Sequence, residues 1–295
     1  MAQIEKFNSG GFVTVGDQVN CDYRQGNTKI QDAIDFGHTE IRIAGGVYKE
    51  NISIDDQDVQ LLGGYADCQA AENDIYNSSS QNVVISPLDN SGLPVIRVTG
   101  NSQRHYLYLR NLKITNGEGV YLGDGHYQAG GVSFVLADYS VNIINTEIRQ
   151  NQGAAGGVAV INGKTNISMK GTSIISNNAS YRGGGIYCSG SDNSIRLNNE
   201  GLFSYNHETL TVLGNIAEGA GGGAYINAGC KLLSTAGDGL DGFILNQSEG
   251  DGGAIFAANG AKIELIGHRK CTVFPSYDCF GNNKDSAFFY LNKAD

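Results

Sequence analysis

The chain of 295 residues has no tryptophan, only three prolines and only two methionines. Basic residues are also scarce, because 20 lysines and arginines stand against 30 aspartates and glutamates, which gives a formal charge of −10. Nucleic acids and anionic membrane surfaces select basic patches, so both are disfavoured as partners. An anionic polysaccharide is disfavoured for the same reason, unless a cation such as Ca²⁺ bridges it to the protein. We expect no other cofactor.

Long apolar runs are absent as well. No stretch approaches the ~18 apolar residues of a membrane span, so we expect no membrane insertion. The N-terminal residues also lack the apolar core of a signal peptide. Glycine, in contrast, is abundant, with 42 residues, and 40 % of the chain is hydrophobic. This apolar content argues against disorder, and the irregular glycine spacing excludes collagen.

Six cysteines are present, and none belongs to a closely spaced Cys-x-x-Cys pair: Cys21, Cys68, Cys188, Cys230, Cys271 and Cys279. Zinc sites prefer such close pairs, so we expect no metal site. An even number of cysteines without metal spacing favours disulfides over buried thiols, and disulfides favour an exported protein. We therefore expect a mature form from which a leader is absent. The cysteine pairing stays open, although Cys271 and Cys279 are close enough in sequence to close a small loop.

A glycine pair followed by a β-rich run recurs five times, at Gly130-Gly131, Gly156-Gly157, Gly184-Gly185, Gly222-Gly223 and Gly252-Gly253. The steps between the first glycines are 26, 28, 38 and 30 residues. Before four of these pairs, an asparagine ends a hydrophobic-x-x-Asn unit: Asn151, Asn177, Asn215 and Asn246. These features indicate a repeat protein.

Short alternating strands separate the glycine pairs and leave no room for a helix. One such unit cannot bury its apolar face alone, but units stacked at ~4.8 Å bond to one another and close a continuous core. The asparagines can then form a ladder with inward side chains, while glycine permits a left-handed backbone or a close approach. Units of 26–30 residues suit a parallel β-helix. A propeller blade needs 40–45 residues, and a leucine-rich repeat has its own consensus.

The two ends of the chain are predicted to cap this solenoid. Residues 28–36 carry Ile30, Ala33 and Ile34 at helical spacing, with Thr28 as the expected N-cap, so we expect a short helix that covers the exposed end. No linker or composition break divides the chain. We therefore expect one domain over 1–295, with an N-terminal cap (1–37), roughly nine or ten coils (38–266) and a C-terminal cap (267–295).

Two sets of residues carry a family resemblance. Ile30-Gln-Asp-Ala-Ile34, followed by Glu40-Ile-Arg-Ile-Ala-Gly-Gly-Val-Tyr-Lys-Glu-Asn51, resembles the opening of bacterial right-handed parallel β-helix proteins of the pectate-lyase-like superfamily. Phe243-Ile-Leu-Asn246 and Gly252-Gly-Ala-Ile255 are similar to repeats of polymorphic outer-membrane proteins and related surface β-helices. The resemblance implies an all-β, right-handed parallel β-helix in an extracellular or cell-surface location. It implies no single activity, because that superfamily includes lyases, hydrolases, phage tailspikes and non-catalytic adhesins.

Residues just before the glycine pairs vary between units and are predicted to form a stripe along one edge of the coils. Aligned on the pairs, this stripe contains His126, Tyr127, Tyr181, Arg182 and Glu218. Tyrosine stacks on sugar rings and arginine forms bidentate hydrogen bonds. We therefore predict that a ligand is bound by Tyr121, Tyr127, Tyr181, Arg182 and Glu218. The alternative is that turn residues are polar only because turns are exposed.

The insertion 117–128 lengthens one turn of the repeat. Long loops on a rigid scaffold often carry function. Within it, Asp124 and His126 have the spacing of a pair that shares a metal or acts as base and orienter, although a flexible tip explains them equally well. If the protein is an enzyme, the catalytic candidates are Glu118, Asp124, His126 and Glu147.

Two functional hypotheses from different classes follow. The first is a non-catalytic, adhesin- or passenger-like β-helix that binds a polysaccharide or another surface ligand. The second is a polysaccharide lyase or glycoside hydrolase; a hydrolase needs two carboxylates in one groove, ~5–5.5 Å apart for retention or ~6.5–9.5 Å for inversion. We prefer the first, because the clustered calcium-binding acids of pectate lyases and the ordered motifs of pectin hydrolases are missing. The ligand and the oligomeric state stay open.

Overall fold

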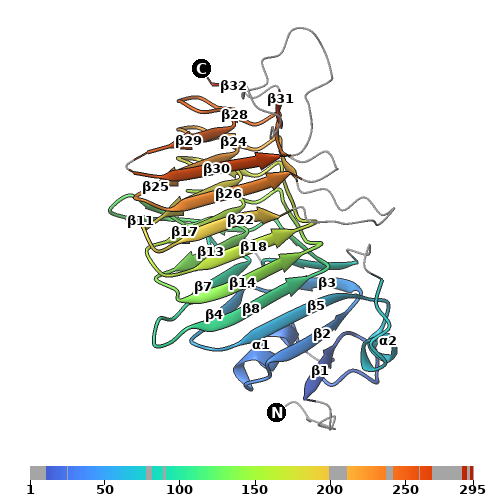
Figure 1. The fold of residues 1–295 in the computed structure, drawn as a ribbon. Coiled ribbons are helices and arrows are strands. Elements are labelled where there is room, and N and C mark those ends of the chain that lie inside the picture. The colour runs from blue at the N-terminus through green and yellow to red at the C-terminus, as the bar shows by residue number, and fades with distance from the viewer. Residues whose placement is uncertain are drawn as a thin grey trace.

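Stacked parallel strands make up almost all of the regular structure in the computed structural model of the chain (Figure 1). The structure describes residues 11–24, 26–77, 82–88, 91–198, 211–236, 242–258, 260–267, 288–290 and 293–294. Strands account for 50 % of the chain, and two short helices occur within the described ranges. The prediction of an all-β parallel β-helix is therefore confirmed.

Each coil passes through three long ladders and most coils through a short fourth one, which we name sheets A, B, C and D. Sheet A contains, in order, β1 (Phe12–Val15), β2 (Glu40–Ala44), β5 (Val59–Tyr65), β8 (His105–Arg110), β14 (Tyr139–Ile144), β18 (Asn166–Lys170), β22 (Ser194–Asn198), β26 (Lys231–Ala236) and β30 (Lys262–Gly267). Sheet B contains β3 (Gly46–Lys49), β6 (Val83–Ser86), β9 (Leu112–Thr115), β15 (Glu147–Arg149), β19 (Ser173–Ile175), β23 (Thr211–Leu213), β27 (Gly242–Ile244) and β31 (Phe288–Tyr290).

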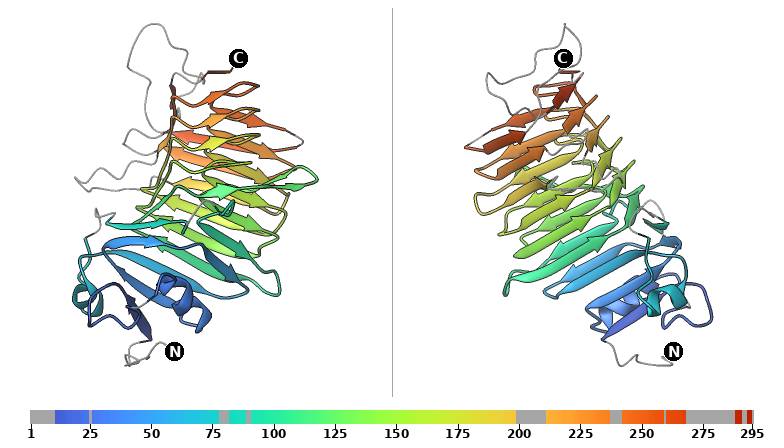
Figure 2. Two further views of the ribbon diagram at one scale, coloured as in Figure 1. Left: turned by 180° about the vertical axis from the view of Figure 1, so that it is seen from behind. Right: turned by 45° about the vertical axis from the view of Figure 1, so that its right-hand side comes forward.

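Sheet C contains β4 (Ile52–Asp55), β7 (Ile96–Thr99), β13 (Val132–Val135), β17 (Val158–Ile161), β21 (Ile186–Ser189), β25 (Ala224–Asn227) and β29 (Ile255–Ala257). Sheet D contains β10 (Glu118–Gly119), β16 (Gln152–Gly153), β20 (Asn178–Ala179), β24 (Ile216–Ala217), β28 (Gln247–Ser248) and β32 (Lys293–Ala294). Every strand of these four sheets pairs in parallel with its counterpart one coil away, so the sheets form the walls of one solenoid (Figure 2).

The interior is built from side chains that alternate inward along each strand. In β14, Tyr139, Val141 and Ile143 are buried, whereas the residues between them are more exposed. The parallel register aligns aliphatic side chains at one strand position through six coils of sheet A. These residues are Leu107, Val141, Ile167, Ile195, Leu232 and Ile263. Burial of one such side chain contributes ~1.5–3 kcal/mol, so the stacked rows supply the continuous core that no single coil could form.

The four repeated asparagines form the predicted internal ladder. Asn151, Asn177, Asn215 and Asn246 are at most 1 % exposed. The side-chain amide of Asn151 donates to Oδ1 of Asn177 at 3.0 Å, and Asn177 donates to Asn215 at 3.0 Å, which in turn donates to Asn246 at 2.9 Å. Each amide also donates to a backbone carbonyl one coil earlier, as Asn177 does to Ile148 at 2.9 Å. The prediction that these side chains point inward and bond one another is confirmed.

A tight turn places each of these asparagines. The residue before it has a left-handed backbone, with φ of 53° at Gln150, 52° at Ser176, 59° at Gly214 and 53° at Leu245. For a residue other than glycine this conformation costs on the order of 1 kcal/mol. The buried amide bonds of the ladder offset that cost and make the turn repeat from coil to coil.

The predicted alignment of the last glycine pair is wrong by one residue. Ala224 pairs with Ile255 and Tyr225 pairs with Phe256, so Gly222 is in register with Gly253. A shift of one residue exchanges the two faces of a strand. The structure therefore places Phe256 beside Tyr225, where the glycine alignment would have placed Ile255.

A short helix covers the N-terminal end of the solenoid, as predicted (Figure 1). Helix α1 (Lys29–Asp35) contributes Ile30, Ala33 and Ile34 to the main core. Thr28 stands at the N-cap position, as predicted, but its side chain makes no capping hydrogen bond. The carboxylate of Glu50 accepts hydrogen bonds from the backbone N–H groups of Ile30 (3.2 Å) and Gln31 (2.9 Å) instead. A second helix, α2 (Cys68–Glu72), is capped by Asp67 and was not predicted.

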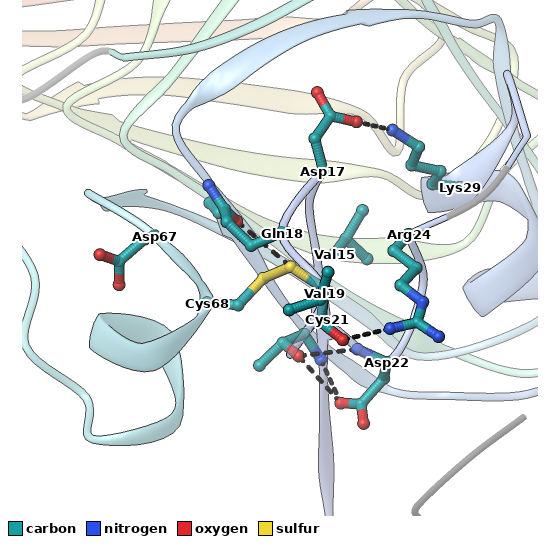
Figure 3. Close-up of a disulfide and its surroundings, with 12 residues drawn as sticks. Val15, Asp17, Gln18, Val19, Cys21, Asp22, Arg24, Lys29, Asp67 and Cys68 are labelled. Carbon is teal, nitrogen blue, oxygen red and sulfur yellow. Dashed lines mark hydrogen bonds and ion pairs between the residues drawn. A yellow bond between two sulfur atoms is a disulfide. The ribbon is translucent and has the colours of Figure 1, made fainter.

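Two disulfides join segments that are distant in sequence. Cys21, in the connection after β1, is bonded to Cys68 at the start of α2, with a Cα separation of 5.4 Å (Figure 3). Cys188 in β21 is bonded to Cys230, which precedes β26, with a Cα separation of 6.1 Å. Cys271 and Cys279 lie outside the described residues. The prediction of disulfides is confirmed for these four cysteines.

Strands of the solenoid also lie outside 38–266. Strand β1 pairs with β2, and β31 and β32 pair with β27 and β28. Of the nine strands described in sheet A, eight begin within 38–266, and the last of these, β30, ends at Gly267. This is fewer than the nine or ten coils predicted for that range, because α2 and several long connections lengthen individual coils. No helix in the described ranges has the length and apolar character needed to cross a bilayer.

Replacement of Asn177 by leucine should lower the free energy of unfolding by about 3 kcal/mol or more. The change leaves several buried partners of the ladder unsatisfied, and each such group costs ~1–3 kcal/mol. Asn178→Leu is the matched control, because Asn178 is the next residue and is exposed. Denaturant unfolding of both variants tests the register, and equal midpoints would contradict it.

Glu50→Gln should weaken the pH dependence of stability. Glu50 is 1 % exposed. Burial raises its pKa from 4.5 to about 7, although the two backbone hydrogen bonds act in the opposite direction. Between these values the unfolded chain releases a proton that the folded protein retains, so stability falls as the pH rises, by on the order of 3 kcal/mol.

Unfolding free energies at pH 5 and pH 8 measure this effect. The loss between the two pH values should be smaller in Glu50→Gln than in the parent protein. The control variant Glu249→Gln, at an exposed position, should behave like the parent. An identical loss in all three proteins would show that Glu50 does not titrate as described.

Candidate ligand-binding site

A second apolar layer lies outside sheet C, separate from the solenoid core. It is formed by Tyr127, Ala129, Ala154, Ala155, Ala159, Ile161, Tyr187 and Tyr225, with Phe256 packed against it. The layer lies between the outward side chains of sheet C and the connections that lead from sheet D to sheet C. Strands β17 and β21 are therefore buried on both faces.

An aromatic column runs through this layer. Tyr187, Tyr225 and Phe256 occupy the same register position in three successive coils. The rings of Tyr187 and Tyr225 are 5.8 Å apart with an interplanar angle of 12°, and those of Tyr225 and Phe256 are 5.2 Å apart at 19°. The repeat of the coils, ~4.8 Å, brings equivalent rings to stacking distance.

A tyrosine triangle lies at one end of this column. The ring centroids of Tyr121, Tyr127 and Tyr181 are separated by 5.1, 5.4 and 5.6 Å. Tyr127 also contacts Tyr187 edge to face at 5.2 Å, so the triangle and the column are continuous. Tyr127 is 8 % exposed, whereas Tyr121 and Tyr181 are 47 % and 48 % exposed. Tyr121 and Tyr181 thus expose about half of their surface to solvent and pack against the buried ring of Tyr127.

The hairpin that carries Tyr121 and Tyr127 is held in a defined place. Strands β11 (Tyr121–Gly123) and β12 (His126–Tyr127) pair in antiparallel fashion at the side of the solenoid (Figure 1). The turn residues Asp124 and Gly125 have φ of 50° and 78°, as a two-residue type I′ turn requires. The phenol of Tyr187 donates to the carbonyl of Gly125 at 2.7 Å. Burial raises the pKa of Tyr187 to about 12, so the phenol keeps the proton that it donates.

Arg182 lies against the same rings. Its Nη1 donates to the hydroxyl of Tyr225 at 2.7 Å. The guanidinium carbon is 4.8 Å from the ring centroid of Tyr225 and 5.6 Å from that of Tyr127. The guanidinium has five N–H donors, so most of them stay available to a ligand.

The structure brings four of the five predicted ligand residues together: Tyr121, Tyr127, Tyr181 and Arg182. Glu218 makes no described contact with them. Ala217 pairs with Ala179, so Glu218 follows the same ladder as the exposed Ser180, one coil further along. Counting back from the glycine pairs gives the same equivalence, because Glu218 and Ser180 each stand four residues before a pair. The alignment of Glu218 therefore agrees with the structure, although no described contact joins Glu218 to the tyrosines.

The catalytic candidates are distributed over different elements. Glu118 in sheet D accepts hydrogen bonds from the backbone N–H of Gly92 at 3.1 Å and from Gln152 at 3.3 Å. Glu147 in sheet B forms ion pairs with Arg149 at 2.9 Å and Lys113 at 3.8 Å.

The other two candidates lie in the hairpin. Asp124 is exposed at its tip, and Nε2 of His126 is 2.8 Å from the side-chain amide nitrogen of Asn162. Among the described residues, no group of three or more His, Cys, Asp and Glu side chains is placed to hold a metal ion.

Sequence reasoning missed the aromatic column. Tyr187 and Tyr225 each stand three residues after the first glycine of a pair, and this equal spacing could have predicted that their rings stack. Phe256 stands four residues after Gly252, so the same count does not place it in the column. The hairpin also had a signal, since Asp124-Gly125 is a favoured type I′ dipeptide.

No protein-family model, curated protein or solved structure matches this chain.

Tyr187→Phe should loosen the hairpin without disturbing the solenoid. The variant keeps the ring in the column but loses the hydrogen bond to Gly125, which is worth about 1 kcal/mol. Amide hydrogen exchange in 121–127 should become faster, while exchange in sheets A and B stays unchanged. Unchanged exchange in the hairpin would show that the phenol does not hold it.

Proposed function

We propose that this protein is a non-catalytic, secreted or surface β-helix that binds carbohydrate at the tyrosine triangle. The observation that carries the proposal is the pair of half-exposed rings, Tyr121 and Tyr181, stacked 5.6 Å apart on the buried ring of Tyr127. Arg182 lies against the rings of Tyr127 and Tyr225 and has further N–H donors besides the one bonded to Tyr225. This combination of flat apolar faces and fixed polar donors suits a sugar ring.

Folding has already restricted the side-chain conformations of the tyrosine triangle, so binding a ligand loses little further conformational entropy. Tyr121 and Tyr181 contact each other and Tyr127, so few rotamers remain to be lost when a ligand binds. The C–H face of a sugar can cover an exposed ring, while its hydroxyls accept hydrogen bonds from Arg182. Preorganisation of this kind favours affinity for a small, neutral ligand.

A purely structural role explains only part of the arrangement. Tyr127 is buried and Tyr187 donates to Gly125, and both contacts attach the hairpin to the solenoid. They do not account for the exposed apolar side chains beside Tyr121, namely Val120 at 43 % and Leu122 at 45 %.

The proposed location rests on two observations. The two disulfides are typical of proteins that fold in oxidising compartments. The sequence motifs resemble those of pectate-lyase-like and surface β-helices of bacteria, which supports an extracellular or cell-surface location.

The alternative, a polysaccharide lyase or glycoside hydrolase, has no comparable observation in its favour. The carboxylates of Glu118 and Glu147 lie in different sheets, and each is engaged by neighbouring groups of the protein.

A panel of neutral oligosaccharides, followed by calorimetric titration of the best binder, tests the proposal. Tyr181→Ala should weaken binding about tenfold, because it removes one stacking surface. Tyr106→Ala is the matched control, since Tyr106 is 61 % exposed on sheet A, away from the triangle. Absence of any neutral ligand, or equal binding by both variants and the parent, would contradict the proposal.

A further inference from the structure

A basic groove lies on a chain whose formal charge is −10. The groove has a volume of about 1020 Å³ and lies where the turns from sheet C enter the first residues of the strands of sheet A. Five cationic side chains line it, namely Arg104, Lys164, Arg196, Lys231 and Lys262. Only two acidic residues, Asp192 and Glu264, share the lining. The local charge is therefore opposite in sign to that of the whole molecule.

Two lysines stand side by side in this groove. Lys231 and Lys262 are in register in adjacent strands, ~4.8 Å apart along the axis. Both are exposed, and neither forms an ion pair within the part of the chain that the structure describes. Like charges opposite one another in a sheet are destabilising. A bound anion between them would convert this repulsion into attraction.

Arg196 and Lys164 extend the basic surface. Arg196 lies on β22, two residues beyond Ser194, which is in register with Lys231. Neither Arg196 nor Lys164 has an ion-pair partner among the described residues. Arg104 differs, because its charge is neutralised by Asp138 at 2.8 Å. Four unpaired cations are therefore available to one ligand.

The turns that carry these cations are fixed from inside. Asn193, which is 1 % exposed, donates to the carbonyl of Ser189 at 2.7 Å and accepts from the backbone N–H of Thr165 at 2.9 Å. In the next coil the equivalent position is Cys230, whose disulfide to Cys188 joins the turn to sheet C. The residue before Lys231 is thus covalently anchored, which is the support that a preorganised site needs.

We propose that this groove binds a glycan that carries sulfate or phosphate ester groups, with one such group between Lys231 and Lys262. Lysine acts as a compact point charge with three donors, and it suits a tetrahedral oxyanion with several acceptor oxygens. A planar carboxylate is better matched by a bidentate arginine fork. The groove lies along the strand starts of sheet A, whereas the tyrosine triangle lies outside sheet C, so the two sites are independent.

Titration with dextran, dextran sulfate, dextran phosphate and polygalacturonate tests the proposal. The first three polymers share one sugar backbone and differ only in their ester groups, whereas polygalacturonate carries carboxylates. The sulfated or phosphorylated polymer should bind, more weakly as salt is raised, and unmodified dextran should not bind this groove. The sulfate and phosphate arms distinguish the two esters. Stronger binding of polygalacturonate than of either ester would overturn the assignment of a tetrahedral anion, and binding of neither ester would overturn the proposal.

The variant Lys231→Gln/Lys262→Gln should weaken binding of the esterified polymer about a hundredfold, because it removes two charge-assisted bonds. The control Lys49→Gln/Arg97→Gln removes two exposed cations elsewhere and changes the net charge equally. Melting temperatures verify folding, and Arg196→Gln provides a second variant on the groove. Equal losses in the variant and the control would show nonspecific attraction and refute the site. Tyr181→Ala should leave binding of the esterified polymer unchanged, because Tyr181 belongs to the tyrosine triangle. The two variants therefore test the proposed carbohydrate site and the proposed groove site separately.

Discussion

The hydrogen-bonded ladder of buried asparagines is the constraint on which the rest of the structure depends. Each side chain bonds both the backbone and the amide of the neighbouring coil, so a coil cannot slide or rotate without leaving buried polar groups unpaired. The ladder therefore sets the register of sheet D, which begins immediately after it. Through sheet D it also determines where Tyr181 and Arg182 leave the solenoid.

The connection that follows the ladder varies in length from coil to coil. The intervals from asparagine to glycine pair are 5, 7, 7 and 6 residues, although the strands on either side stay in register. The extra residues after Asn177 include Tyr181 and Arg182, and the hairpin 121–127 enlarges the equivalent connection one coil before Asn151. A rigid ladder thus supports adjustable loops, and the aromatic layer outside sheet C fills the space between them.

Net charge proved a poor guide to the surface of this molecule. A value of −10 argued against nucleic acids, anionic membranes and anionic polysaccharides that no cation bridges. Charges, however, act over about a Debye length, ~8–10 Å, rather than over the whole protein. Parallel stacking brings side chains at one strand position into a column, so Lys231 and Lys262 lie together despite 30 intervening residues. The acidic residues of the chain lie mostly elsewhere and do not neutralise this groove.

The sequence by itself determined the features that repeat within one coil. Alternating strands, the asparagine column, the helix 28–36 and the presence of disulfides all follow from local spacing and composition, and the structure confirms them. Only the tertiary structure decided which residues meet across coils: the cap at Glu50, the pairing of Cys188 with Cys230, and the column through Phe256. Insertions of different length separate these partners in sequence. Contacts between coils depend on the summed length of those insertions and on the face that each strand turns inward, and a shift of one residue reverses that face.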